Sequence, residues 1–244
     1  EPKKILNYSK KPILDLGKLG TFDDAGVMPG SIIKFKKKKL MFYTGWSRTI
    51  DVPFSTQIGL AKLSGRNFFR LSQAPVIGKN FFDPYITNAP YVISEKKILR
   101  MWYVSATEWK KEKRNLKPKH FYTIKHAFSK DGLNWNCSNK LCLPYKKNEY
   151  AIARPVVWKE KKKYKMWFTY RCDNKNNRVG YASSNDGISW NRSKNDIGIE
   201  LSKKGWDSEM ICYAHPLFHK DKIYALYNGN NYGEKGVGLA LLNQ

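Results

Sequence analysis

The sequence predicts an all-β fold, a β-propeller of four-stranded antiparallel blades, and three observations carry this prediction. One pattern recurs four times, with its prolines at positions 29, 90, 155 and 216, in steps of 61, 65 and 61 residues. Each repeat contains short β-branched and aromatic runs bounded by Lys, Asn, Asp and Gly, which is the composition of strands and hairpins. No segment has a helical period, so we expect no major helix. Repeats that bury their faces only against neighbours are typical of propeller blades.

The elements of each blade are expected in the same order. First strands begin at the repeated prolines, and second strands follow as aromatic runs at residues 40–43, 99–103, 165–168 and 223–227. Third strands carry small residues, which let neighbouring sheets approach closely, at residues 58–61, 124–127, 179–182 and 237–240. Asp-Gly turns then return Trp135 and Trp190 into the space between sheets, and Trp102 and Trp167 are also expected in the core. A fourth strand follows, as at residues 69–71.

The chain ends bear on how the propeller closes. Residues 1–244 are expected to form a single β-propeller domain with four visible blade cores. Residues 5–8 resemble the outer strand of the first repeat, and the chain ends just after the third strand of the fourth repeat. An outer strand from one terminus and three strands from the other would close a ring of four blades. Alternatively, the first blade lies mostly upstream and is missing, because the chain begins without Met or an apolar signal region.

The charge balance is strongly basic, with 45 Lys and Arg against 20 Asp and Glu, a net charge of +25. Such a surface attracts nucleic acid, an anionic membrane face, an acidic glycan or a nucleotide sugar. However, the lysines cluster at residues 36–39, 110–113 and 159–163, where solvated hairpin tips would give the same composition. We do not expect nucleic-acid binding, which requires one continuous basic groove.

Composition excludes several other classes. A hydrophobic content of 41% and an aromatic content of 14% supply a core, which excludes global disorder. There is no run of eighteen apolar residues, so no membrane-spanning helix is expected. The four cysteines show neither a C-x-x-C pair nor zinc spacing, so a reduced, cytoplasmic chain is the expectation.

The blade plan resembles a known superfamily. The aromatic hairpins and the motif Ser-x-Asp-Gly-x-x-Trp, at residues 129–135 and 184–190, are similar to the five-bladed propellers of invertase, levansucrase, arabinanase and the mannoside phosphorylases. Residues 22–29, 150–155 and 205–210 resemble an uncharacterised branch often found among genes for bacterial surface polysaccharides. The resemblance covers the whole chain and implies five blades, with about one absent upstream. It also implies glycoside chemistry by acidic residues at the mouth of a central funnel.

Acidic residues precede the repeated prolines, where inner strands are expected to line the channel. Glycoside hydrolysis needs one protonated carboxyl for the leaving oxygen and one ionised carboxylate as base or nucleophile. The catalytic candidates are Asp24, Glu209 and Glu149, with Asp207 in support. Two alternatives stay open. Asp23 faces the funnel instead of Asp24, or Glu149 simply pairs with Arg154.

Familiar members of the superfamily carry an acid directly before the inner-strand proline. In this chain the corresponding residues are Met28, Ala89, Arg154 and His215. The absence of these acids favours glycosyl transfer or phosphorolysis. The high positive net charge and the presence of Arg154 favour the same activities.

The substrate-binding candidates are Arg154, His215, Trp46, Arg48, Asp83, Asn88, Trp109 and Tyr150. Arg154 and His215 are expected at equivalent positions of neighbouring blades, where arginine can hold a phosphate or carboxylate with two parallel hydrogen bonds. Their alternative role is to pair with nearby acids. Trp46 and Trp109 are expected in loops, where aromatic rings stack on the apolar faces of sugars.

One member of this set has a simpler alternative role. Asp83 is also a common turn starter before proline. No cofactor or metal site is assigned, although the resemblance allows a channel-bound calcium or other cation with His215 as a ligand.

The leading interpretation is a carbohydrate-active, glycoside hydrolase-like enzyme whose partner is a carbohydrate, a nucleotide sugar or a phosphate-bearing glycan. The alternatives are glycosyl transfer or phosphorolysis in surface polysaccharide synthesis, and a non-catalytic glycan-binding propeller. A protein-interaction propeller is the least favoured, because such a scaffold needs no acids at its axis. The sequence has no phosphate-binding glycine loop, Cys–His pair or Ser–His–Asp order, which leaves kinase, cysteine-protease and serine-hydrolase activities without support.

Overall fold

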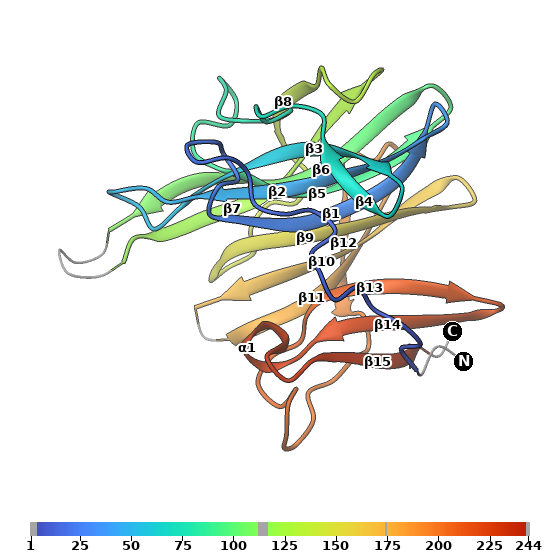
Figure 1. Cartoon of the computed structure of the whole chain (residues 1–244). Helices are drawn as coiled ribbons and strands as arrows, with labels where there is room; N and C mark the ends of the chain where they lie inside the picture. The colour runs from blue at the N-terminus through green and yellow to red at the C-terminus, as the bar shows by residue number, and fades with distance from the viewer. Residues whose placement is uncertain (1–3, 112–116, 174, 243–244) are drawn as a thin grey trace. The chain divides into compact units, whose positions relative to one another are not determined.

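The computed structural model describes residues 4–111, 117–173 and 175–242. The chain divides into two compact units, Glu1–Lys140 and Leu141–Gln244, and each is described by itself. Strands dominate both units (Figure 1), as the sequence predicts. The only helix in the described ranges is the four-residue α1 (Asn230–Gly233), in which Asn231 and Tyr232 have left-handed backbone angles. No helix in this part of the chain is long and apolar enough to cross a membrane.

Unit 1 contains the first two predicted blades as antiparallel sheets. The first sheet consists of β1 (Gly26–Phe35), β2 (Lys38–Ser47), β3 (Ser55–Ser64) and β4 (Asn67–Arg70), paired in chain order. The second consists of β5 (Thr87–Glu95), β6 (Ile98–Lys110), β7 (Lys119–Ser129) and β8 (Asn136–Leu141), again in chain order. Buried side chains of the two sheets pack together, among them Phe42 and Leu60 from the first and Met101 from the second.

Unit 2 contains the third and fourth predicted blades. The third consists of β9 (Glu149–Glu160), β10 (Lys163–Cys172), β11 (Lys175–Ser184) and β12 (Asn191–Asp196), in chain order. The fourth consists of β13 (Cys212–His219), β14 (Lys222–Asn228) and β15 (Val237–Leu242). Trp167 and Val179 of the third sheet pack against Ala225 and Tyr227 of the fourth.

The predicted outer strand at residues 5–8 is not formed. Residues 4–25 contain no strand, and the side chains of Ile5 and Leu6 are 81% and 87% exposed. The segment joins the first sheet only further along, where the amide of Phe68 donates to the carbonyl of Ile13 at 2.8 Å. Apolar residues at this spacing resemble a strand, but this segment buries neither side chain.

Glycines of the third strands make room for aromatic rings of the second strands. In three sheets the register places Gly59 opposite Tyr43, Gly180 opposite Phe168 and Gly238 opposite Tyr227. A Cβ atom at these glycines would lie 2.3, 2.5 and 2.8 Å from the facing ring. The small residue therefore accommodates a ring of its own sheet, whereas the sequence led us to expect close approach of neighbouring sheets. In the second sheet Lys125 takes this position, opposite Tyr103.

The predicted core tryptophans are buried or packed as expected. The indole N–H of Trp135 and that of Trp190 each donate at 3.0 Å to a glycine carbonyl three residues earlier, in the Asp-Gly turn. The Trp135 ring meets Phe42 of the first sheet edge to face, with centroids 5.6 Å apart. Trp102, Trp167 and Trp190 are all buried.

Replacing Gly59 with alanine is expected to lower the free energy of unfolding by about 1–3 kcal/mol, because the new methyl group overlaps the Tyr43 ring. Urea unfolding followed by tryptophan fluorescence measures the change. The control Ser64→Ala, at the exposed end of β3, should alter stability by no more than about 0.5 kcal/mol. A Gly59→Ala protein as stable as the control would show that the ring does not need this space.

Candidate functional site

Three of the acids that precede first strands are held by tyrosines. Each aspartate lies twenty residues before its tyrosine, and the hydroxyl donates to Oδ2 at 2.9 Å in the pairs Tyr43–Asp23, Tyr103–Asp83 and Tyr227–Asp207. All three aspartates are buried. The third sheet has Asn148 and Phe168 at the matching positions. The repeated interval of twenty residues was present in the sequence and was the signal that could have identified these pairs.

Two of these aspartates also pair with cations. The Arg70 Nε atom lies 2.6 Å from Asp23, and the Lys125 Nζ atom lies 3.1 Å from Asp83. A buried carboxylate is strongly disfavoured unless hydrogen bonds or a cation compensate it. The pairs therefore explain why these acids tolerate burial. They also place Asp83, a predicted substrate-binding residue, inside a structural network.

The Tyr227 hydroxyl stays a donor over a wide pH range. Burial, followed by the hydrogen bond to Asp207 and the charge of that carboxylate, raises the pKa of Tyr227 to about 12. The hydroxyl is therefore protonated at neutral pH and continues to hold Asp207.

Glu149 is held by Arg192. The Arg192 Nη1 atom lies 2.7 Å from Glu149 Oε2, which also accepts a hydrogen bond from the amide of Lys146 at 2.9 Å. The Arg192 guanidinium in turn stacks over the rings of Phe168 and Tyr170, 4.8 and 4.6 Å from their centroids. The pairing considered from the sequence was with Arg154; the observed partner comes from β12.

Asp24 and Glu209 differ from the other candidate acids. Asp24 is partly buried, and its carboxylate accepts a hydrogen bond from the amide of Gly20 at 3.0 Å. The side chain of Glu209 is exposed, while its amide and carbonyl are fixed by Asn230 Oδ1 and by Arg178 Nη1. Neither carboxylate forms an ion pair within the described residues. These two acids remain available for a ligand.

Unit 1 contains a cavity of about 400 Å³, and the first residue of its lining, Ala25, directly follows Asp24 in the chain. Its lining is Ala25, Gly26, Val27, Trp46, Ser47, Arg48, Pro53 and Phe54. The Trp46 ring lies 4.7 Å from Phe54, which lies 5.6 Å from Trp109. Two predicted sugar-stacking residues therefore meet through Phe54, which the sequence did not single out. The expectation that they lie in loops is wrong, because Trp46 belongs to the end of β2 and Trp109 to the end of β6. Arg48 supplies a cation to the lining.

Asn88 lies between the two sheets of unit 1. Its side-chain amide donates to Thr56 Oγ1 at 3.3 Å, and it is partly buried in β5. This predicted binding residue thus links the two sheets.

Arg154 and His215 are not equivalent positions, contrary to the expectation. The residue before Arg154 pairs with Thr169, and the residue before Tyr213 pairs with Asn228, which makes Tyr213 the counterpart of Arg154. Both have left-handed backbone angles, with φ of 50° and 57°. In β13 two residues, Ala214 and His215, lie between Tyr213 and the proline, whereas in β9 Arg154 directly precedes the proline. His215 is exposed, and its Nδ1 atom lies 3.1 Å from the carbonyl of Pro216.

A second cavity, of about 420 Å³, lies in unit 2. It is lined by Tyr150, Arg171, Cys172, Asp173, Asn176, Asn177, Met210 and Tyr232. It includes one predicted binding residue, Tyr150, and Glu209 directly precedes its liner Met210. Within the described ranges, no group of three or more His, Cys, Asp or Glu residues is arranged to hold a metal ion.

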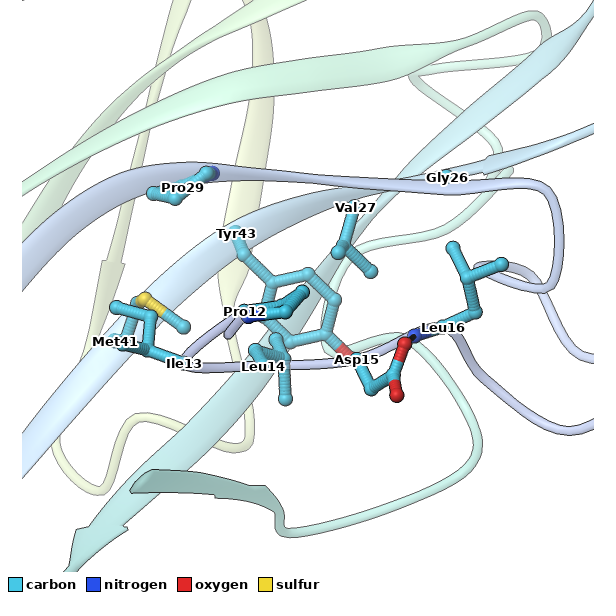
Figure 2. A pocket seen from close by; sticks show the side chains of 10 residues that line it. All are labelled: Pro12, Ile13, Leu14, Asp15, Leu16, Gly26, Val27, Pro29, Met41 and Tyr43. Carbon is cyan, nitrogen blue, oxygen red and sulfur yellow. Dashed lines mark hydrogen bonds between the residues drawn. The ribbon is translucent and has the colours of Figure 1, made fainter. Parts of the chain in front are cut away.

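A third cavity, of about 480 Å³ in unit 1, is largely apolar. Figure 2 shows residues 12–16 passing beside β1, with Met41 and Tyr43 also in the lining. Its one acid is Asp15, whose carboxylate accepts the amide of Leu16 at 2.8 Å. With so few polar groups, this cavity does not suit a sugar.

Comparison with known proteins places the chain in a family. No protein-family model matches it. The uncharacterized protein Rv1502 of Mycobacterium tuberculosis strain H37Rv is 35% identical over 241 residues, which is 98% of this chain and 79% of that protein. The uncharacterized protein MT1551 of strain CDC 1551 matches equally well. The chain belongs to the Rv1502 family.

Solved structures confirm the fold of this Rv1502 family member. A glycoside hydrolase matches with a TM-score of 0.68 and 16% identity over 92% of this chain and 71% of its own. A thermostable family-43 glycoside hydrolase matches with a TM-score of 0.65 and 17% identity, over 88% of this chain and 71% of its own. The GH32 beta-fructofuranosidase BmSUC1 of Bombyx mori matches with a TM-score of 0.64 and 18% identity, over 88% of this chain and 45% of its own. The chain therefore has the glycoside-hydrolase-like β-propeller fold that the sequence predicts.

Replacing Asp207 with asparagine is expected to lower the free energy of unfolding by about 1–3 kcal/mol, because Tyr227 then donates to a neutral group in a buried site. Thermal and urea unfolding measure the change. The exposed control Asp51→Asn should stay within about 0.5 kcal/mol of the wild type. Unchanged stability of Asp207→Asn would contradict the structural role of this acid and return it to the catalytic candidates.

Proposed function

We propose that this Rv1502 family member acts on glycosidic bonds of a carbohydrate. The observation that carries the proposal is the aromatic wall of Trp46 and Phe54 at a cavity that begins one residue after Asp24. Aromatic rings offer a large apolar surface with little conformational freedom, which suits the apolar faces of sugars. The fold shared with glycoside hydrolases supports this assignment.

Asp24 in unit 1 and Glu209 in unit 2 are each proposed as a catalytic carboxyl, and each is considered within its own unit. In this chemistry one carboxylic acid protonates the leaving oxygen, and one carboxylate activates water or attacks the sugar. Both roles require a carboxyl that a substrate can reach. Asp207 and Glu149 are engaged with Tyr227 and Arg192, so we assign them to support of the strands that carry the site.

The finer proposal concerns the setting of the activity. We propose that residues 1–244 act as one propeller domain on a glycan or nucleotide sugar of bacterial surface polysaccharide synthesis, in the cytoplasm. The net charge of +25 supports an acidic or phosphate-bearing substrate. Transfer and phosphorolysis remain included, because an acceptor sugar or phosphate can replace water at the same site.

Trp46→Ala is expected to weaken binding of the best oligosaccharide from a neutral and acidic panel by at least tenfold, because the stacking surface beside Phe54 is lost. Titration calorimetry gives the affinity. The control Phe69→Ala removes an aromatic ring that is 57% exposed on β4 and should leave affinity unchanged within twofold. Equal affinities for both variants would rule out the aromatic wall as the sugar site.

Glu209→Gln and Asp24→Asn are each expected to lower turnover of activated glycosides at least a hundredfold, because a neutral amide neither donates an acidic proton nor acts as a base. The assay is run with and without phosphate to separate hydrolysis from phosphorolysis. Glu200→Gln removes an exposed acid of the same unit as Glu209 and should retain turnover. If both variants stay as active as this control, other residues perform the chemistry.

A second candidate function is glycan binding without catalysis. The three aspartates that precede first strands, Asp23, Asp83 and Asp207, are engaged with tyrosines, and Glu149, the first residue of β9, is engaged with Arg192. This engagement favours a binding scaffold over a ring of reactive carboxylates. A wild-type protein that binds oligosaccharides through Trp46 but turns over no glycoside would support this function.

A further inference from the structure

Two arginines and two tyrosines form one stack in unit 2, beside the cavity of about 420 Å³. The Arg154 guanidinium lies 5.0 Å from the Tyr213 ring centroid, and the Arg171 guanidinium lies 5.1 Å from that of Tyr232. Between them, the two tyrosine rings stack with centroids 5.9 Å apart and an interplanar angle of 23°. Arg171 and Tyr232 line the cavity, so this end of the stack faces it.

The backbone at this stack is held in an unfavourable conformation. Arg154, Tyr213, Asn231 and Tyr232 have φ values of 50°, 57°, 50° and 60°. Non-glycine residues rarely adopt this region, and each one costs about 1–3 kcal/mol. Such residues cluster at ligand sites, where the surrounding structure imposes them. Arg154 and Tyr213 share this conformation with Ala89 at the matching bulge of β5, so the recurring bulge fixes where these two members of the stack lie.

Arg171 is oriented before any ligand arrives. Its Nε atom donates to Asn177 Oδ1 at 2.5 Å, and the Asn177 side chain is buried. Asn177 is itself anchored, because its carbonyl accepts the amide of Ile211. The Tyr232 ring covers the guanidinium and is 46% exposed. A fixed guanidinium loses less entropy when it binds an oxyanion through two parallel hydrogen bonds.

The charges around the cavity are compatible with an anion. Among the described residues of its lining, Arg171 carries the positive charge and Asp173 the negative charge. Asp173 is exposed, so water screens its charge. Tyr150 and Asn176 add polar groups to the lining.

We propose that this cavity binds an acidic sugar through its oxyanion, which is a phosphate or a carboxylate group. Arg171 binds the oxyanion, and Tyr232 provides the surface for the sugar ring. The inference rests on the proposed function for the sugar part of the ligand. It adds a site in unit 2 that is separate from the aromatic wall of Trp46.

The test is titration of the whole chain with glucose 6-phosphate, glucuronate, inorganic phosphate and glucose. The wild type is expected to bind at least one of the acidic sugars and not glucose, and the preferred acidic sugar identifies the anion. Arg171→Gln should weaken this binding at least tenfold, and Arg171→Lys, which keeps the charge but loses the planar fork, should fall between. Thermal unfolding of both variants verifies that they fold.

Lys204→Gln is the matched control, because it removes one exposed positive charge from the same unit and should change affinity less than twofold. The inference is overturned if no acidic sugar binds, or if Lys204→Gln weakens binding as much as Arg171→Gln. If only this inference is wrong, neutral oligosaccharides still bind through Trp46 while no acidic sugar binds through Arg171. If only the proposed function is wrong, acidic sugars still bind through Arg171, but the protein turns over no glycoside.

Discussion

An aromatic ring laid across the third strand of its own sheet is the constraint on which the rest of the structure depends. Gly59 and Gly238 leave space for Tyr43 and Tyr227, and each hydroxyl then reaches a buried aspartate ahead of the first strand. In the second sheet Lys125 replaces the glycine and pairs with the aspartate directly. The tyrosine of the second strand thereby packs on the third strand and holds the loop that leads into the first strand.

This constraint also decides which acids are left for chemistry. The loop before each first strand is where acidic residues were expected to act, yet the buried aspartate of that loop is engaged with tyrosine. Asp24 follows Asp23 by one residue and points its carboxylate away from the Tyr43 network, to the amide of Gly20. Glu209 follows Asp207 by two residues and is exposed. The functional candidates are thus neighbours of structural residues, positioned by them.

Arginine has two different roles in this structure. Arg70 and Arg192 compensate buried carboxylates, and their removal would leave a buried charge unpaired. Arg171 is instead oriented by a neutral amide, Asn177, and stacks on a half-exposed tyrosine. This arrangement places the Arg171 guanidinium in the lining of the cavity. A family member with a net charge of +25 therefore has both structural arginines and one suited to an anionic ligand.

The sequence by itself determined the all-β class, the order of strands and the placement of Trp135 and Trp190, because these depend on turns and alternation within a few residues. Only the tertiary structure decided which acids are engaged, since Arg192 reaches Glu149 across 43 positions and Arg70 reaches Asp23 across 47. It also showed that Tyr213, and not His215, corresponds to Arg154, because a bulge shifts the register in β13. Local pattern sets the strands, whereas long-range hydrogen bonds and register select the residues that remain free to bind.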